Sequence, residues 1–127
     1  MSKLVAHHRS IIRRDERRRN RSKRTSRFHT DRPRRVVYRS LRHFEAQIID
    51  DFKGTTLVSV SSRDKELKSA VKKASNKIEI SHIVGEELAK KAKVGKVGPV
   101  VLDRNGYPYH GRVKAFTKAA RDGGLEL

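Results

Sequence analysis

The stretch Arg34–Ser61 (RRVVYRSLRHFEAQIIDDFKGTTLVSVS) decides the fold of this chain. Its first segment, Arg34–Ser40, is rich in β-branched and aromatic residues, which favour strands. Phe44–Phe52 has the same character, and Thr55–Ser61 alternates apolar with polar residues, as a strand with one buried face does. The dipeptide Lys53-Gly54 supplies a turn. Because short connections join the three segments, we predict an antiparallel meander of three strands.

After this stretch the apolar residues recur every three or four positions, which is the period of a helix with one buried face. The expected stripes are Leu67, Ala70, Val71 and Ala74 in a short helix, Ile80, Ile83, Val84, Leu88 and Ala92 in a longer one, and Val113, Phe116 and Ala120 in a last one. Between the last two, Val97–Leu102 predicts a fourth strand that is covered on both faces. We therefore expect an α/β fold, a mixed sheet of about four strands with packed helices.

Composition limits the classes of function. The 127 residues suit one domain plus a tail. They include 32 Lys and Arg against 14 Asp and Glu, a formal net charge of +18, and such a chain favours a polyanionic partner. Without cysteine, the chain has no disulfides, thiol nucleophile or Cys-type metal site. No apolar run approaches the roughly 20 residues of a membrane span, so we expect no membrane partner. The lack of cysteine is compatible with the expected cytoplasmic location, a reducing compartment.

The cations concentrate at the N-terminus. Residues 1–43 hold sixteen cations, fourteen of them arginines, against three acids, which gives +13 and leaves +5 for the remainder. The planar guanidinium of arginine matches phosphate geometry. His7–Arg27 has too few apolar residues to fold alone, but arginine is a good helix former, so phosphates can order this segment as a helix. A solvated, disordered tail is the alternative.

We accordingly divide the chain into a basic extension, residues 1–31, and a globular domain, residues 32–127. The candidate RNA contacts in the extension are Arg9, Arg13, Arg14, Arg17, Arg18, Arg21, Arg24 and Arg27.

A second candidate site is Asp103–Lys114 (DRNGYPYHGRVK), where cations and aromatic rings surround a turn that leads into a helix. Aromatic rings stack on unpaired bases, and cations neutralise phosphates. Gly111 at the helix entry allows a close backbone approach, and the free amides of a helix N-terminus suit a phosphate. For either tyrosine alone, burial at a strand–helix corner is an equal alternative. The candidate contacts are Arg104, Asn105, Tyr107, Tyr109, His110, Gly111, Arg112 and Lys114.

A third basic patch surrounds the turn of the first hairpin. Its candidate contacts are Arg34, Arg35, Arg39, Arg42 and His43, and the alternative is a solvated hairpin end. Other patterns carry no chemistry. His7-His8 has no further metal ligand nearby, and the carboxylates of Asp50-Asp51 point to opposite faces of a strand. We predict no metal, no cofactor, no small-molecule substrate and no catalytic site.

Asp103–Val113 and the ending Ala119–Leu125 (AARDGGL) together resemble a family of large-subunit ribosomal proteins, the eighteenth in the subunit's naming, whose bacterial members bind 5S rRNA. Arg34–Asp51 and the strand that ends in Ser61-Ser62 resemble the same family in the same order. The resemblance implies a three-layer mixed sheet related to the ribonuclease H-like arrangement. By position it adds Ser40 and Gln47 to the RNA contacts.

The same resemblance implies the partners. The protein would bind 5S rRNA in the central protuberance of the large ribosomal subunit, help attach it to large-subunit (23S-type) rRNA, and neighbour another 5S-binding ribosomal protein.

The sequence therefore predicts a structural RNA-binding protein and not an enzyme. A metal-dependent nucleic-acid enzyme is one alternative, but such enzymes need clustered carboxylates, and the first predicted strand, Arg34–Ser40, carries arginines and no acid. A general RNA chaperone or DNA-compacting protein is the other alternative. Metal-dependent cleavage of RNA by the purified protein would indicate the first alternative. The second would be indicated if competitor RNA displaced the protein from every RNA that it binds.

Overall fold

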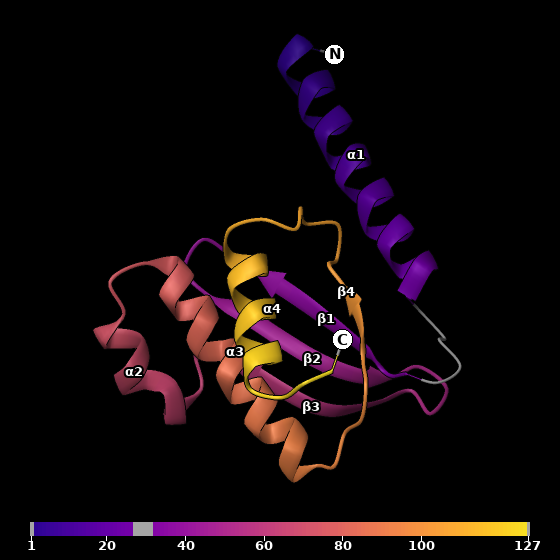
Figure 1. The fold of residues 1–127 in the computed structure, drawn as a ribbon. Helices are drawn as coiled ribbons and strands as arrows, with labels where there is room; N and C mark the ends of the chain where they lie inside the picture. The colour runs from indigo at the N-terminus through magenta and orange to yellow at the C-terminus, as the bar shows by residue number, and fades with distance from the viewer. Residues whose placement is uncertain (1, 27–31, 127) are drawn as a thin grey trace.

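The structure, a computed structural model, describes residues 2–26 and 32–126, with the backbone alone at residues 22, 23, 25 and 26. The elements in chain order are α1 (Lys3–Ser26), β1 (Arg34–Arg39), β2 (Phe44–Asp50), β3 (Thr55–Ser61), the 3-10 turn η1 (Lys65–Leu67), α2 (Lys68–Lys73), α3 (Lys77–Val94), β4 (Val101–Asp103) and α4 (Arg112–Asp122). Helix α1 projects from a body that the other elements form (Figure 1).

The strands form one mixed sheet in the order β3-β2-β1-β4. Strands β1, β2 and β3 pair antiparallel, which confirms the predicted meander, and β4 lies parallel to β1. Strand β4 is shorter than predicted and begins only at Val101. The amide of Val97 instead donates to the carbonyl of Ala92 at the end of α3, and Pro99 has no amide hydrogen for a sheet ladder.

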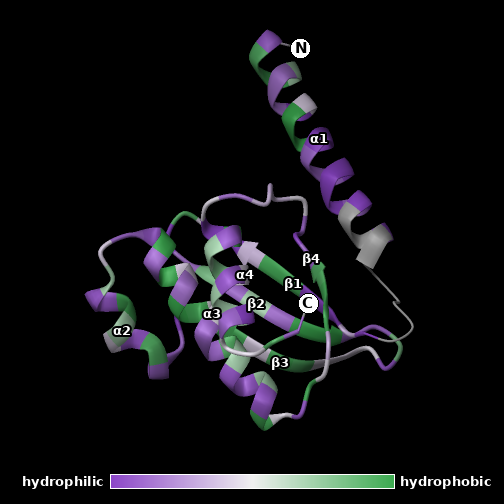
Figure 2. Ribbon diagram, in the orientation of Figure 1, coloured by the Kyte–Doolittle hydropathy of each residue, from purple (hydrophilic) through white to green (hydrophobic). Residues whose placement is uncertain are grey.

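Helices α3 and α4 pack on one face of the sheet (Figure 1). The core between them contains Val37, Phe44, Ala46, Ile48, Val84, Leu88, Val113 and Phe116, all buried. Figure 2 shows hydrophobic residues along the strands, whereas most of α1 is hydrophilic. On the opposite face Tyr38 is 54% exposed and Leu57 is 47% exposed. In the described part of the chain the helical layer therefore covers one face, and the expected third layer is not seen.

The predicted helices are confirmed. The short stripe forms η1 and α2, the longer one forms α3, and the last forms α4. The side chain of Asn76 caps α3 by accepting a hydrogen bond from the Glu79 amide at 2.9 Å, which stabilises a helix start. Helices α3 and α4 approach closely at Gly85, where an added Cβ would lie 2.5 Å from the carbonyl oxygen of Phe116.

Candidate nucleic-acid interface

The β1–β2 turn and the β4–α4 loop meet at one end of the sheet. The guanidinium of Arg112 joins them, because its Nη1 donates to the carbonyl of Ser40 at 2.8 Å and its Nη2 to that of His43 at 2.9 Å. The hydroxyl of Tyr107 bonds to the backbone of Arg39, donating to its carbonyl and accepting from its amide at 3.4 Å. Two segments that the sequence suggested separately are thus one unit.

Hydrogen bonds within the β1–β2 turn hold its shape. The amide of Ser40 donates to the carbonyl of His43 at 2.9 Å, and the amide of His43 donates to Ser40 Oγ at 3.1 Å. The ring of His43 lies 3.0 Å from Ser62 Oγ through Nδ1. These bonds turn Leu41 and Arg42 outward, and Leu41 is 83% exposed. Sequence reasoning missed Leu41, although an apolar residue inside a short polar turn is a signal of exposure.

The β4–α4 loop owes its path to backbone conformations with positive φ. Asn105 and Gly106 have φ of 53° and 84°, which Asn and Gly adopt more readily than other residues. The carboxylate of Asp103 accepts a hydrogen bond from the Asn105 amide at 2.9 Å. Gly111 precedes the first residue of α4 and has φ 58° and ψ −118°, a backbone conformation that residues with a Cβ rarely adopt. The loop therefore presents its side chains from a constrained backbone.

We call six exposed residues at this end of the sheet, from the turn, the loop and the first turn of α4, the tip surface. They combine cationic, aromatic and apolar side chains, and they are Leu41, Arg42, Arg104, Tyr109, His110 and Lys114. Five of these six residues were candidates from the sequence. Asn105 and Gly111 lie in the same loop and are partly buried.

Arg34 and Arg35 were also candidates, and their side chains are buried in the protein. The guanidinium of Arg34 donates from Nη1 to Asp103 at 2.9 Å and from Nη2 to Asp51 at 3.1 Å. The buried guanidinium of Arg34 thus neutralises these two carboxylates. The RNA contact predicted for each residue stays a prediction, and in this structure both side chains are enclosed by the protein.

Arg35 has a different environment from Arg34. Its side chain has 0% exposure, its Nη2 donates to Thr117 Oγ1 at 3.1 Å, and its guanidinium lies 4.9 Å from the centre of the Phe116 ring. Burial, with repulsion from Arg121 as the next cause, lowers the pKa of Arg35 to about 9. The two buried nitrogens Nε and Nη1 have no hydrogen-bond partner among the described residues.

Arg112 likewise acts within the protein. Partial burial and the nearby charge of Arg39 lower the pKa of Arg112. Since both of its terminal nitrogens bind backbone carbonyls of the turn, its guanidinium holds the tip surface in place. The side chain of Arg39 lies 4.8 Å over the ring of Tyr107. The RNA contact predicted for Arg112 stays a prediction, and in this structure its guanidinium positions the turn.

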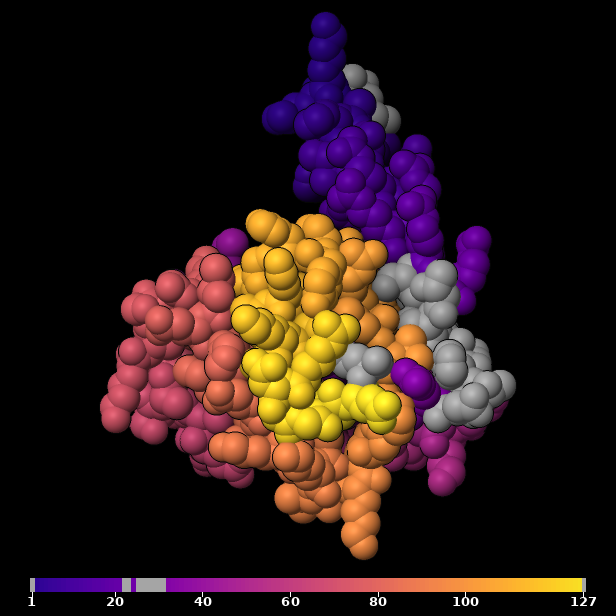
Figure 3. Space-filling model, viewed as in Figure 1, coloured from indigo at the N-terminus to yellow at the C-terminus, as the bar shows by residue number. Residues whose placement is uncertain are grey.

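Helix α1 carries the candidates of the N-terminal extension, and Figure 3 shows it projecting beyond the body. The described candidates are exposed, and they are Arg9, Arg13, Arg14, Arg17, Arg18, Arg21 and Arg24. Arg27 lies outside the described residues. Helix α1 approaches the β4–α4 loop at Arg19, because a Cβ on Gly106 would lie 3.0 Å from the Arg19 amide nitrogen.

Gln47, another predicted RNA contact, lies apart from the tip surface. It is exposed in the middle of β2, between Val36 and Ser59 of the neighbouring strands. Its side chain lies on the sheet face opposite the helices, because the alternate residues Ala46 and Ile48 face the core.

Within residues 2–26 and 32–126, no three His, Asp or Glu side chains are placed to hold a metal ion. No helix in that part of the chain has the length and apolar character of a membrane span.

Comparison with known proteins gives a consistent result. Residues 9–127 match the family of ribosomal protein L18 from archaea, bacteria, mitochondria and chloroplasts. The large ribosomal subunit protein uL18 of Staphylococcus haemolyticus is 52% identical over 97 residues, which cover 76% of this chain and 78% of that protein. The uL18 proteins of Dictyoglomus thermophilum (52% identical, 77% and 80% covered) and Caldicellulosiruptor saccharolyticus (50% identical, 76% and 77% covered) are similarly close.

Proposed function

Because the chain belongs to the ribosomal L18 family, whose members are structural proteins and not enzymes, we propose that it binds 5S rRNA and attaches it to large-subunit rRNA. The family membership makes it a component of the large ribosomal subunit. The choice of 5S rRNA, its place in the central protuberance and a neighbouring 5S-binding ribosomal protein follow from the resemblance of Asp103–Val113 to the family signature.

The observation that carries the proposal is the convergence of the turn and the loop at one end of the sheet. Arg42, Arg104 and Lys114 bring three cations to the tip surface, and Tyr109 and His110 bring two rings. Structured RNA offers phosphates for the cations and unpaired bases for the rings. A constrained backbone fixes these groups relative to one another, and this favours recognition of one RNA shape over general attraction to phosphate.

Helix α1 has a different part in the proposal. It holds ten cations and two acids over 24 residues, a density that suits phosphates of any sequence. We propose that residues 1–31 act as an extension that supplies affinity and residues 32–127 as a globular domain that supplies specificity. The sheet order, with β4 parallel to β1, supports a relation to the ribonuclease H-like arrangement with a single helical layer.

The test compares 5S rRNA with an unrelated structured RNA of equal length, each bound by the full-length protein in a filter-binding assay. Arg104→Ala, Tyr107→Ala and His110→Ala should each weaken binding to 5S rRNA about tenfold and to the unrelated RNA less. Lys72→Ala, on an exposed position of α2, should change neither. Equal losses on both RNAs for these three variants would mean that the β4–α4 loop does not select 5S rRNA.

A further inference from the structure

Four large apolar side chains of α1 are exposed, and the proposed RNA binding does not use them. They are Leu4, Val5, Ile11 and Ile12, and their exposed fractions are 78%, 43%, 37% and 43%. The core of the described domain contains none of the four. Because large apolar side chains gain free energy when they leave water, a set of them gathered on one exposed helix points to a partner.

These four residues lie on one face of the helix. Leu4 and Ile11 are seven positions apart, and so are Val5 and Ile12. Seven residues are close to two turns of the helix, so each pair lies in one row along the helix, and the two rows are neighbours. Together they form an apolar stripe about 12 Å long.

Both acids of α1 continue the stripe. Asp15 follows Ile11 by four positions, and Glu16 follows Ile12 by four, which is the spacing of neighbours on one helix face. The carboxylate of Asp15 lies 3.8 Å from Nη1 of Arg18. We call the whole surface the apolar–acidic face, and its residues are Leu4, Val5, Ile11, Ile12, Asp15 and Glu16.

The opposite face of α1 is basic. Arg13 lies two positions after Ile11, and two residues turn a helix by about 200°. Arg17 and Arg21 follow Arg13 at intervals of four, and all three side chains are exposed. This basic face attracts RNA phosphates, whereas the two carboxylates of the apolar–acidic face repel them.

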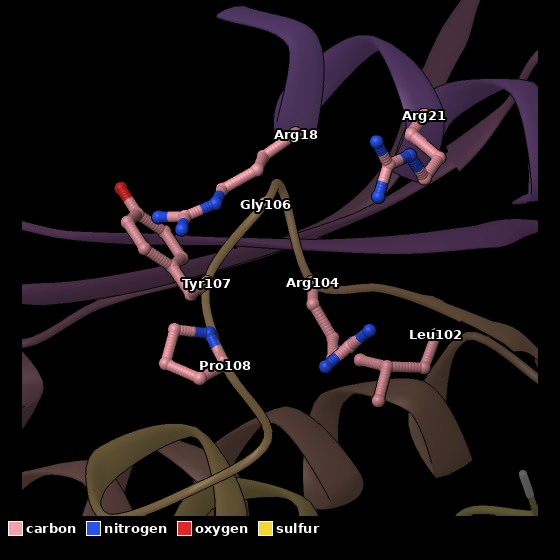
Figure 4. A pocket seen from close by; sticks show the side chains of 7 residues that line it. All are labelled: Arg18, Arg21, Leu102, Arg104, Gly106, Tyr107 and Pro108. Atoms are coloured by element: carbon pink, nitrogen blue, oxygen red, sulfur yellow. The ribbon is translucent and has the colours of Figure 1, made fainter. Parts of the chain in front are cut away.

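Contact with the body fixes the direction in which each face of α1 points. Figure 4 shows Arg18 and Arg21 of α1 beside the β4–α4 loop, and a Cβ on Gly106 would lie 3.1 Å from Arg18 Cβ. This contact sets the rotation of α1 about its own axis. The stripe lies N-terminal to the contact, where α1 projects beyond the body (Figure 1). A partner therefore meets a preorganised surface, which lowers the entropic cost of binding.

We propose that the apolar–acidic face binds another protein of the large subunit while the basic face binds rRNA. The partner presents an apolar groove for the stripe, as proteins that bind one face of a helix do, and a lysine or arginine for Asp15 and Glu16. A second copy of this chain fits less well, because α1 carries ten cations and two acids, 10 − 2 = +8, and two such helices repel each other. The inference goes beyond the proposed RNA binding and needs only the membership of the large subunit.

The chain has no cysteine, so one introduced cysteine can carry a benzophenone photo-crosslinker at a chosen position. His8→Cys places it on the apolar–acidic face, four positions from both Leu4 and Ile12. The matched control, Ser10→Cys, places it two positions further, on the opposite face. Large subunits reconstituted with each labelled full-length protein are irradiated and digested with ribonuclease. His8→Cys should give a protein adduct that survives the digestion, and Ser10→Cys should give an adduct with RNA.

Mass spectrometry of the His8→Cys adduct should identify a peptide of another subunit protein with apolar residues next to a lysine or arginine. Adding Ile12→Gln to the labelled protein should lower the yield of this adduct about tenfold, because one buried isoleucine is lost from the contact. Adding Ala6→Gln, outside the apolar–acidic face, should leave the yield unchanged.

The inference is overturned if the His8→Cys adduct contains only RNA, a second copy of this chain, or a peptide without a cation. It is also overturned if no adduct forms at this position, or if Ile12→Gln leaves the yield unchanged. The choice of 5S rRNA is tested separately by filter binding, so either assignment can fail while the other stands.

Discussion

The arginines of β1 and those of α1 are equally conspicuous in the sequence, yet the structure uses them in opposite ways. In β1, Arg34 and Arg35 are buried and bind other parts of the protein. In α1 the described arginines are exposed. Strand β1 has neighbouring strands on both sides and a helical layer on one face, whereas α1 contacts β4 and the loop after it around Arg18 and Arg19. The fate of an arginine therefore depends on whether its segment joins the core.

The two buried arginines also differ from each other. Arg34 lies between the carboxylates of Asp51 and Asp103, whereas the contacts of Arg35 among the described residues are a hydroxyl and an aromatic ring. A buried charge without a counter-charge destabilises the folded state. The pKa of Arg35, lowered by burial to about 9, has the same physical origin.

The largest effect should come from α1. Changing Arg13, Arg14, Arg17 and Arg24 together to Gln, a good helix former, should weaken rRNA binding on the order of a thousandfold at about 0.1 M salt. The slope of log affinity against log salt should become shallower by up to about 3.6, or about 0.9 for each lost phosphate contact. Filter binding over a KCl series measures both. Unchanged binding would mean that these four arginines of α1 do not contribute to the affinity for rRNA.

The next effect concerns the fold. Arg35→Ala should lower the free energy of unfolding by about 3 kcal/mol, because it leaves a cavity beside Phe116. Arg35→Met fills the cavity and removes the buried charge, so it should retain or raise stability. Urea denaturation measures both, and the affinity of the folded variants for rRNA should stay within about twofold of wild type. A stable Arg35→Ala protein that had lost rRNA binding would contradict the contrast between β1 and α1.

A smaller effect is expected at Arg112, which belongs to neither group because it is partly buried and holds the tip surface. Arg112→Lys replaces a fork with a single ammonium group and cannot bind both turn carbonyls in the same way. It should lower the free energy of unfolding by about 1–2 kcal/mol and weaken selection of 5S rRNA over unrelated RNA. If selection were unchanged while stability fell, the turn would not depend on Arg112 for its RNA-binding shape.

The smallest effect lies at Glu79, remote from both groups of arginines. Hydrogen bonds from the amide and hydroxyl of Ser75 lower the pKa of Glu79 below 4.5. Since the folded-state pKa is the lower one, this stabilisation is present above pH 4.5 and is lost as the pH falls through the folded-state value. Glu79→Gln should therefore show a shallower fall of Tm in acid, measured by circular dichroism between pH 7 and pH 3. An identical fall of Tm in both proteins would mean that Glu79 does not contribute to the loss of stability in acid.

Local patterns made much of the fold predictable. Strand β3 has the predicted bounds, and the stripe of Val113, Phe116 and Ala120 faces the core in α4, because alternation and helical spacing depend on neighbouring residues only. The start of β4 was misplaced, since its pairing with β1 brings together residues far apart in the chain.

The sequence predicted most residues of the candidate site but not the role of each one. The segment RRVVYR carries an arginine toward each face of the sheet, and strand alternation gives no signal that both of these arginines are buried. The bond between Arg112 and Ser40 joins residues 72 positions apart, and only the fold shows that this guanidinium is occupied. Leu41 became a candidate only when the turn was seen to present it.

The contact between Gly106 and α1 has a mechanical consequence. A 24-residue helix is about 36 Å long, and this one contacts the loop at Arg18 and Arg19, about two-thirds of the way from its N-terminal end. Its free end, where Leu4 and Val5 are exposed, is then held at a set distance and direction from the loop. If two segments of RNA contacted opposite ends of this helix, the length of the helix would fix the distance between them.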